Sequence, residues 1–505
     1  MMPYITSIFF VLLIGAIITF KTRSREEART VALISSWAAL LISVVMFIKF
    51  DGELGLGNFR EFYTWIPSIG INYHVGVDGV SMPMVLLSTI VSAFCTIYAW
   101  GEKKRANQFF GLILLMDLAL IGVFVSLDFF LFFIFWELTL IPMFFLIGIW
   151  GGPRKNYAAI KFLLYTHVGS VVMLLGIFAM YALNGNLTGI YTFDIPTLIS
   201  AFNTLPSPEI WRNFIFAALL FGFLVKMPAV PFHTWLPDAH VEAPTVGSII
   251  LAGVLLKMGG YGLFRFLVPM APSASPVFIY IIAIFGLISI LYSPFAALAQ
   301  FDLKKLVAFS SIGHMGFISL GVAGSLASGS EIPRIFAQSG AMFQLFAHGI
   351  ITCVLFGACG VIEHNTGTRI IPDLGGLAKK MPKFTFLMVI GFFASMGFPG
   401  MAGFIAEFSI LAGTYPQLPV FIILAMFSIP LTAAYHLWAL QRVMFGPYNE
   451  YLGDVHEIVW HEFFALSAWV VLIIILGIYP MPLFDMMQSA ATNLVLMSPT
   501  GGTIS

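Results

Sequence analysis

Charged residues are scarce in this chain, and their scarcity decides its class. Only 10% of the 505 residues are charged, 59% are hydrophobic, and the mean hydropathy is +0.96. A soluble domain is typically about 25% charged, and a soluble core could not hide this much apolar surface. The composition therefore excludes a soluble protein and predicts an all-α, polytopic membrane protein.

Cysteine and an excess of charge of either sign are also lacking. Cys95, Cys353 and Cys359 lie in apolar runs, without the spacing of a thiolate-held cluster or of structural disulfides, so we expect packing residues. The 24 Lys and Arg balance the 24 Asp and Glu, which excludes a basic face for nucleic acid. No hydrophilic stretch is long enough for a nucleotide-binding domain, and we expect no cofactor on this chain.

Long apolar runs are what the sequence does have. Windows of about 20 residues predict about fourteen transmembrane helices. We read the first as a helix, because it lacks the cleavage site of a secretory signal. The predicted spans are residues 4–20, 31–48, 81–100, 109–127, 129–150, 162–183, 213–230, 243–264, 276–296, 306–323, 336–360, 384–402, 418–440 and 463–480.

The positive charges give these spans an orientation. With the N-terminus outside, seventeen of the 24 Lys and Arg residues fall in inner loops and five in outer loops. This asymmetry follows the positive-inside rule and places both termini outside. The two remaining cations, Lys226 and Lys257, lie inside apolar spans.

Two acids join them, Glu137 in "FIFWELTLIPMFF" and Glu407 in "AGFIAEFSIL". A charge at the bilayer centre costs about 2.5–3.5 kcal/mol on insertion scales, so residues of this kind usually serve function. We expect all four to carry protons or to form ion pairs, the alternative being structural hydrogen bonds between helices. Two intramembrane histidines, with an ordinary pKa of about 6.5, suit a proton relay; they are His314 and His348.

Other polar residues have weaker support. His167, Asp117 and Arg369 are accessory candidates. The segment 231–244, "PFHTWLPDAHVEAP", contains four residues of metal-ligand type, but its three prolines favour an irregular connection at the mouth of a proton path, or helix capping, over a metal site. The four residues are His233, Asp238, His240 and Glu242.

An internal repeat relates two parts of the chain. "FLLYTHVGSVVMLLG", residues 162–176, aligns with "FQLFAHGIITCVLFG", residues 343–357, at an offset of 181 residues that also carries Lys226 onto Glu407. The offset spans an odd number of predicted helices, so the copies would run in opposite directions, as in secondary transporters with broken helices and midplane ion sites. "MPAVP" after Lys226 and "GFPGMAG" before Glu407 predict such breaks.

The spans and the repeat divide the chain into four parts. We predict N-terminal helices in 1–108, a first five-helix repeat in 109–268, a second, inverted five-helix repeat in 269–446, and a last helix with a tail in 447–505.

The segment 225–265, "VKMPAVPFHTWLPDAHVEAPTVGSIILAGVLLKMGGYGLFR", resembles the signature of the antiporter-like subunits of respiratory complex I, Mrp antiporters and membrane-bound hydrogenases. In that family it accompanies a glutamate of the fifth helix and lysines of the seventh and eighth, which fall on Glu137, Lys226 and Lys257. Glutamate at the twelfth-helix position, here Glu407, and the runs "GVDGVSMPMVLL" and "FWELTLIPMF" are similar to those of subunit M.

This resemblance implies a proton-translocating subunit of a complex I-like oxidoreductase that couples electron transfer from NADH, or a reduced deazaflavin, to a quinone or phenazine. A Glu137–Lys226 ion pair, Lys257 and the two histidines would pass protons toward Glu407. FMN or FAD, iron–sulfur clusters and the quinone or phenazine would lie on other subunits, and neighbouring antiporter-like subunits would be the partners.

Two other functions compete with this one. A subunit of an Mrp-type sodium/proton antiporter shares the signature, and a structural subunit with inert buried charges would tolerate Lys226→Ala. The expected location is the plasma membrane of a prokaryote; an organellar inner membrane fits less well.

Overall fold

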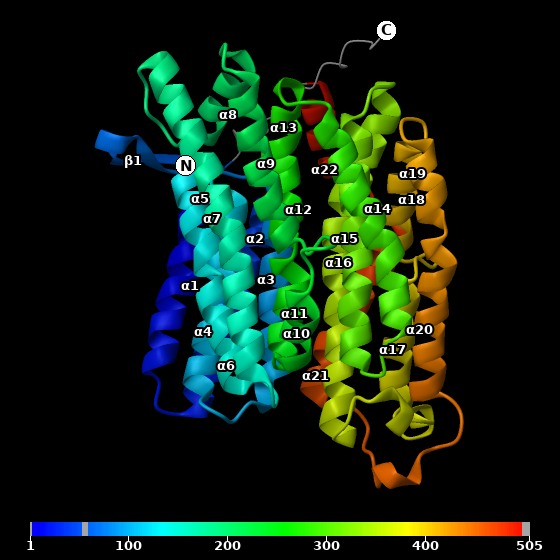
Figure 1. The fold of residues 1–505 in the computed structure, drawn as a ribbon. Coiled ribbons are helices and arrows are strands. Elements are labelled where there is room, and N and C mark those ends of the chain that lie inside the picture. The colour runs from blue at the N-terminus through cyan, green and yellow to red at the C-terminus, as the bar shows by residue number, and fades with distance from the viewer. Residues whose placement is uncertain (1–2, 53–58, 497–505) are drawn as a thin grey trace.

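The computed structural model describes residues 3–52 and 59–496, and in this part the chain is a bundle of long helices (Figure 1). The N-terminal part and the first predicted repeat contain α1 (Tyr4–Lys21), α2 (Arg25–Ile48), β1 (Glu61–Ile66), β2 (Ile71–Val75), α3 (Ser81–Tyr98), α4 (Ala106–Val125), α5 (Phe129–Leu138), α6 (Leu140–Trp150), α7 (Lys155–Thr188), α8 (Ile195–Thr204), α9 (Glu209–Lys226), α10 (Trp235–Glu242), α11 (Thr245–Ile250), the π-helical segment η4 (Leu251–Leu255), α12 (Lys257–Gly262), a second π-helical segment η5 (Leu263–Leu267) and α13 (Val268–Met270).

The rest of the chain is helical as well. It contains α14 (Val277–Leu298), α15 (Leu303–Leu326), α16 (Glu331–Thr366), α17 (Pro382–Ser395), α18 (Ala402–Thr414), α19 (Pro419–Met426), α20 (Ser428–Met444), α21 (Trp460–Ile478) and α22 (Met481–Leu496). The one sheet of the described residues is the antiparallel hairpin β1–β2.

The predicted class, an all-α polytopic membrane protein, is confirmed. Within residues 3–52 and 59–496, twelve helical stretches are long and apolar enough to cross a bilayer. The other two predicted spans are less regular: α9 carries three charged residues, and α17 and α18 are separate helices of 14 and 13 residues. The number fourteen therefore stays a prediction.

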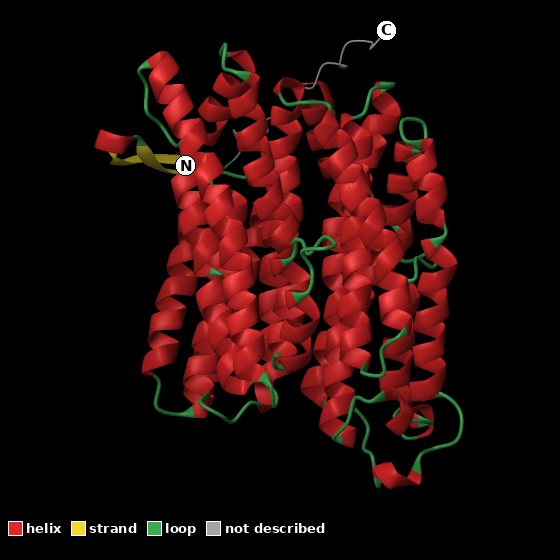
Figure 2. Ribbon diagram, viewed as in Figure 1, coloured by secondary structure: helices red, strands yellow, loops and turns green. Residues whose placement is uncertain are grey.

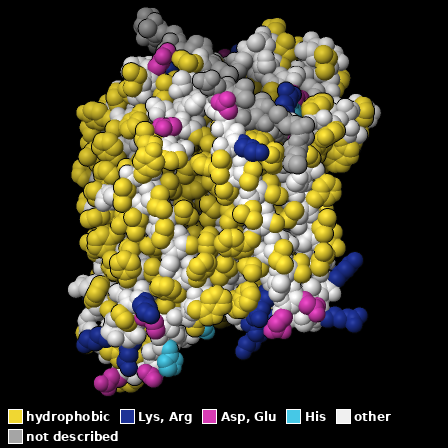
Figure 3. Space-filling view, turned by 180° about the vertical axis from the view of Figure 1, so that it is seen from behind, with side chains coloured by type: hydrophobic (Ala, Val, Ile, Leu, Met, Phe, Trp, Pro, Cys, Tyr) yellow, Lys and Arg dark blue, Asp and Glu magenta, His cyan; other side chains and the backbone are white. Residues whose placement is uncertain are grey.

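The outer surface fits a bilayer. Figure 3 shows a broad hydrophobic belt around the middle of one face, with Lys and Arg side chains gathered mostly at the lower end. That end holds the loops between α1 and α2 and between α20 and α21 (Figure 1), which the charge pattern places inside.

The core lies where the two halves of the bundle meet. The membrane windows of α15, α16 and the helical stretch Thr245–Ser273 are completely buried, whereas only 33%, 39% and 39% of the windows of α1, α7 and α14 are buried. Residues on the three buried stretches are therefore shielded from lipid on every side.

Two helices are broken at half height, where the sequence predicts breaks (Figure 2). Residues 227–234 separate α9 from α10, and residues 396–401 separate α17 from α18. In the second break Gly397 and Gly400 adopt positive φ angles of 71° and 89°, a region that L side chains rarely adopt. The first break, shifted by 181 residues, would fall on 408–415, so one fixed offset does not superpose the two, and the inverted repeat stays a prediction.

A short backbone bridge closes one end of the first half. Asp128 caps α5 by accepting hydrogen bonds from the N–H groups of Phe130 and Leu131. Beside this cap, the N–H of Phe129 donates to the carbonyl of Phe193, in the segment that follows α7, at 2.8 Å.

The second half has the same arrangement at the start of α15. Asp302 caps this helix, and the N–H of Leu303 donates to the carbonyl of Arg369, after α16, at 3.0 Å. In each half, a backbone hydrogen bond thus connects the start of one helix, next to its capping aspartate, to the segment that follows another helix. In the second half an ion pair reinforces the bridge, because Arg369 Nε lies 2.7 Å from Asp302 Oδ2.

Candidate functional site

Glu137 lies in the last turn of α5, and its partner is not the predicted one. Its Oε2 is 2.8 Å from Nδ1 of His167 on α7, while Oε1 has no hydrogen-bond partner. Lys226 instead donates to Oγ1 of Thr139 at 3.2 Å and lies over the ring of Trp136. Among the described residues the expected Glu137–Lys226 ion pair is not a direct contact, because each side chain has a nearer polar neighbour, although the charge of Glu137 still acts on the Lys226 ammonium.

The pair of Glu137 and His167 lies at the surface of the bundle. The side chain of His167 is 53% exposed and that of Glu137 is 24% exposed. Around them Ile141, Leu164 and Val168 expose apolar side chains. A polar pair in such a surface costs free energy in lipid, which favours a position covered by another protein.

Lys226 ends α9 because the chain cannot continue as a helix. Pro228 and Pro231 provide no N–H groups to the break. The N–H of Val230 donates to Ser289 Oγ on α14 at 3.0 Å, so a helix of the other half satisfies a backbone group freed here.

Lys257 is fully buried and follows the π-helical segment η4 directly. Its ammonium donates to the carbonyl oxygen of Ala252, within this segment, and to Nδ1 of His348 on α16 at 2.7 Å. The π-helical turn leaves the carbonyl of Ala252 available to the side chain.

His348 lies between Lys257 and the second half of the bundle. Its ring centre lies 5.2 Å from that of His314 on α15, and His314 Nδ1 is 3.0 Å from Oε1 of Glu407 on α18. Ser395, beside the second break, lies 3.3 Å from the other ring nitrogen of His314. The structure thus brings together Lys257, His348, His314 and Glu407, which we call the buried series.

Lys226 is not joined to this series by a hydrogen bond between the described side chains. The sequence therefore identified the members of the series and missed two polar groups beside the candidates, Ser395 at His314 and Thr139 at Lys226. It also underrated His167, although the internal repeat aligns this residue with His348 and could have signalled it.

The residues of segment 231–244 have separate roles. Asp238 pairs with Lys161 at 2.6 Å, and Glu242 accepts from the N–H of Arg154 at 2.8 Å. His240 stacks on Phe356, with neither ring nitrogen hydrogen-bonded. Within the described residues no three ligand-type side chains form a metal site, and the three cysteines are buried, free thiols.

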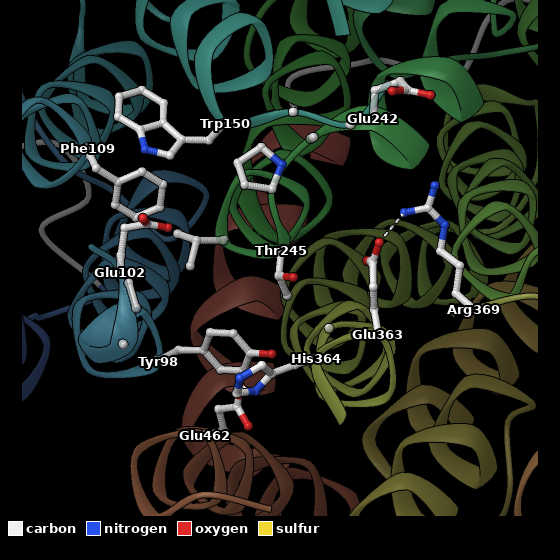
Figure 4. Close-up of a pocket in the computed structure, with 18 of the residues that line it drawn as sticks. Tyr98, Glu102, Phe109, Trp150, Glu242, Thr245, Glu363, His364, Arg369 and Glu462 are labelled. Carbon is white, nitrogen blue, oxygen red and sulfur yellow. Dashed lines mark hydrogen bonds and ion pairs between the residues drawn. The ribbon is translucent and has the colours of Figure 1, made fainter. Parts of the chain in front are cut away.

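A polar cavity of about 590 Å³ opens at the inner end of the bundle (Figure 4). Glu242 lines one side, and Glu363 points to Arg369 at 3.0 Å. His364 and Glu462 lie together at the opposite side, 3.4 Å apart. Burial lowers the pKa of Arg369, but Asp302 and Glu363 outweigh burial and raise it above its ordinary value, so this guanidinium stays charged.

Comparison with known proteins identifies the family of this chain. The family described as "NADH:quinone oxidoreductase/Mrp antiporter, TM" matches residues 126–432, more than half of the chain. The chain belongs to this family. F(420)H(2) dehydrogenase subunit M of Methanosarcina mazei is 47% identical to this family member over 99% of both chains.

Bacterial proteins extend the likeness. NADH-quinone oxidoreductase subunit M of Rhodobacter capsulatus is 38% identical over 93% of this chain and 91% of its own. A chain of the respiratory complex I from Thermus thermophilus superposes with a TM-score of 0.88 at 27% identity, covering 99% of this chain and all of that one. A chain of the Mrp complex from Dietzia sp. has a TM-score of 0.84 at 20% identity and shows the shared fold alone.

Proposed function

We propose that this family member is a proton-translocating membrane subunit of a complex I-like respiratory oxidoreductase. The observation that carries the proposal is the buried series, which runs from the first half of the bundle to the second, with Lys257, His348 and His314 buried and Glu407 only 13% exposed. Its ammonium, imidazole and carboxylate groups can each bind and release a proton.

Protons would come from the inner side. The polar cavity of Figure 4 reaches the level of Glu242, and His240 lies in the same helix, α10. A proton that enters this cavity would pass His240 to Lys257, move through the two histidines to Glu407, and leave on the outer side. Moving one charge against a potential of about 100 mV costs about 2.3 kcal/mol.

That free energy must come from redox chemistry elsewhere in the complex. By the names of its relatives, the donor would be NADH or F(420)H(2), a reduced deazaflavin, and the acceptor a quinone; a phenazine acceptor rests on the sequence resemblance alone. FMN or FAD and iron–sulfur clusters would be held by other subunits.

The neighbours would be antiporter-like membrane subunits, one of them covering the exposed Glu137–His167 pair. The plasma membrane of a prokaryote is the proposed location, in keeping with relatives from an archaeon and a bacterium.

An Mrp-type sodium/proton antiporter is the second candidate, favoured by the shared fold. The identities of 47% and 38% to dehydrogenase subunits, against 20% to the Mrp chain, support the first.

An experiment on inverted membrane vesicles that contain the assembled complex distinguishes the redox pump from the antiporter. Donor oxidation and interior acidification are followed together, with a sodium gradient as the alternative driving force. Donor-driven acidification in the wild type, lost in His348→Gln and kept in His456→Gln, supports the redox pump, because His456 is exposed and outside the series. Acidification driven only by sodium, unchanged by the donor, would identify an antiporter.

A further inference from the structure

Asp117 is a buried acid that the buried series does not use. It lies in the middle of α4, its residue is 2% exposed, and neither carboxylate oxygen has a hydrogen-bond partner among the described residues. No ion pair involves it in that part of the chain either. An ionised carboxylate in this position would cost several kcal/mol. The carboxyl group is therefore neutral and carries its proton.

Polar groups and a small void lie beside this acid. The void is lined by Asp117, by Ser88 and Ser92 of α3, and by Ile250 and Val254 of the stretch across from them. Its volume of about 10 Å³ is close to the roughly 10–15 Å³ that one water needs. Ser92 Oγ lies close enough to the Asp117 carboxyl group to interact with it, but neither group has a well-formed hydrogen bond among the described groups.

The void also touches the π-helical segment that precedes Lys257. Val254 belongs to η4, and so does Ala252, whose carbonyl accepts the Lys257 ammonium. Within η4 the N–H of Leu256 reaches back five residues to Leu251 at 3.1 Å, in place of the α-helical four. One short, irregular stretch of backbone thus separates the acid from the first member of the buried series.

We propose that Asp117, Ser92 and one water form a proton-holding site beside the buried series. The carboxyl O–H donates to the water, the Ser92 hydroxyl contacts the carboxyl group, and the carboxyl proton exchanges with the water. The other titratable group facing Asp117 is the Cys95 thiol of α3, and Lys257 lies beyond the π-helical segment. The site goes beyond the proposed function, because its proton and its water are present whether or not the complex pumps.

Infrared spectroscopy tests the site directly. In the assembled complex, the spectrum of the wild type minus that of Asp117→Asn should show the C=O stretch of one carboxylic acid. This band should shift in D2O, as an exchangeable proton requires. Ser92→Ala should move the band without removing it, because the acid remains and loses one polar neighbour.

Two results would overturn the proposal. A difference spectrum with carboxylate bands in place of the acid band would show an ionised Asp117, and an acid band insensitive to D2O would show a sealed proton without water. Asp117→Leu, which keeps an apolar side chain of similar size, provides a second difference spectrum if the asparagine variant fails to assemble. Absence of donor-driven acidification in the wild type would defeat the proposed function and leave these spectra as informative as before.

Discussion

The two halves of the bundle treat their buried acids differently. In the first half Glu137 pairs with the half-exposed His167 at the bundle surface, whereas in the second half Glu407 pairs with His314, of which 8% is exposed. Both pairs join a glutamate to a histidine at about 3 Å. The difference lies in what can reach them, since the first is open to a neighbouring chain and the second only to residues of this chain. We infer that the surface pair of the first half receives a signal, whereas protons pass through the buried series, from Lys257 of the first half to Glu407 of the second.

Among the variants that test this comparison, Glu137→Gln should lower the rate of donor-driven acidification most. The variant cannot carry a charge at the surface pair, so its coupling to a neighbouring chain should be lost and donor-driven acidification should fall by about 100-fold, within the roughly 5–150-fold range typical of coupling between sites. The measurement is the acidification rate in inverted vesicles, with Glu26→Gln as the control because its side chain is 71% exposed. Wild-type acidification in Glu137→Gln would remove the signalling role of the first half.

Glu407→Gln should have the next largest effect. It leaves His314 without its charged partner at the end of the buried series, and a loss of about tenfold in rate corresponds to about 1.4 kcal/mol. Glu407→Lys should retain more activity than Glu407→Gln, because a lysine can bind and release a proton next to a histidine, in the arrangement that Lys257 and His348 already have. Equal activity of the two variants would show that position 407 needs no titratable group.

His167→Gln sharpens the contrast by removing the exposed partner of Glu137. Exposed ion pairs contribute about 1 kcal/mol or less, so the rate should fall at most about fivefold. Leu164→Ala, on the same exposed face of α7, is the matched control. A loss as severe as that of Glu137→Gln would mean that His167 itself transfers protons.

The smallest effect concerns the two backbone bridges. Asp302→Asn keeps a capping oxygen and loses the ion pair with Arg369, which should cost about 1 kcal/mol. Asp128→Asn also keeps a capping oxygen and breaks no ion pair, so its complex should unfold at a higher temperature than that of Asp302→Asn. Equal midpoints in thermal unfolding would show that the ion pair does not strengthen the second bridge.

The sequence predicted those features that depend on local chemistry. Proline and glycine predicted both helix breaks. The cost of burying charge singled out Lys257 and Glu407 of the buried series, together with Glu137 and Lys226, and the ordinary pKa of histidine singled out the other two members, His314 and His348. Contacts between distant segments could not be predicted from the sequence. Lys257 and His348 are 91 residues apart in the chain, and only the packing of the bundle brings them into contact. The nearest neighbours of the two charges were also beyond the sequence: Thr139 and Trp136 contact Lys226, and His167 contacts Glu137.

The hydrogen bond from the N–H of Val230 to Ser289 has a consequence for the synthesis of the chain. The break after Lys226 emerges from the ribosome about 60 residues before Ser289, and until α14 has been inserted this N–H lacks its partner within the bilayer. The first half therefore cannot reach its final form while it is the only half made. The final form of this break waits for α14, so a chain that stops before Ser289 leaves the N–H of Val230 without this partner.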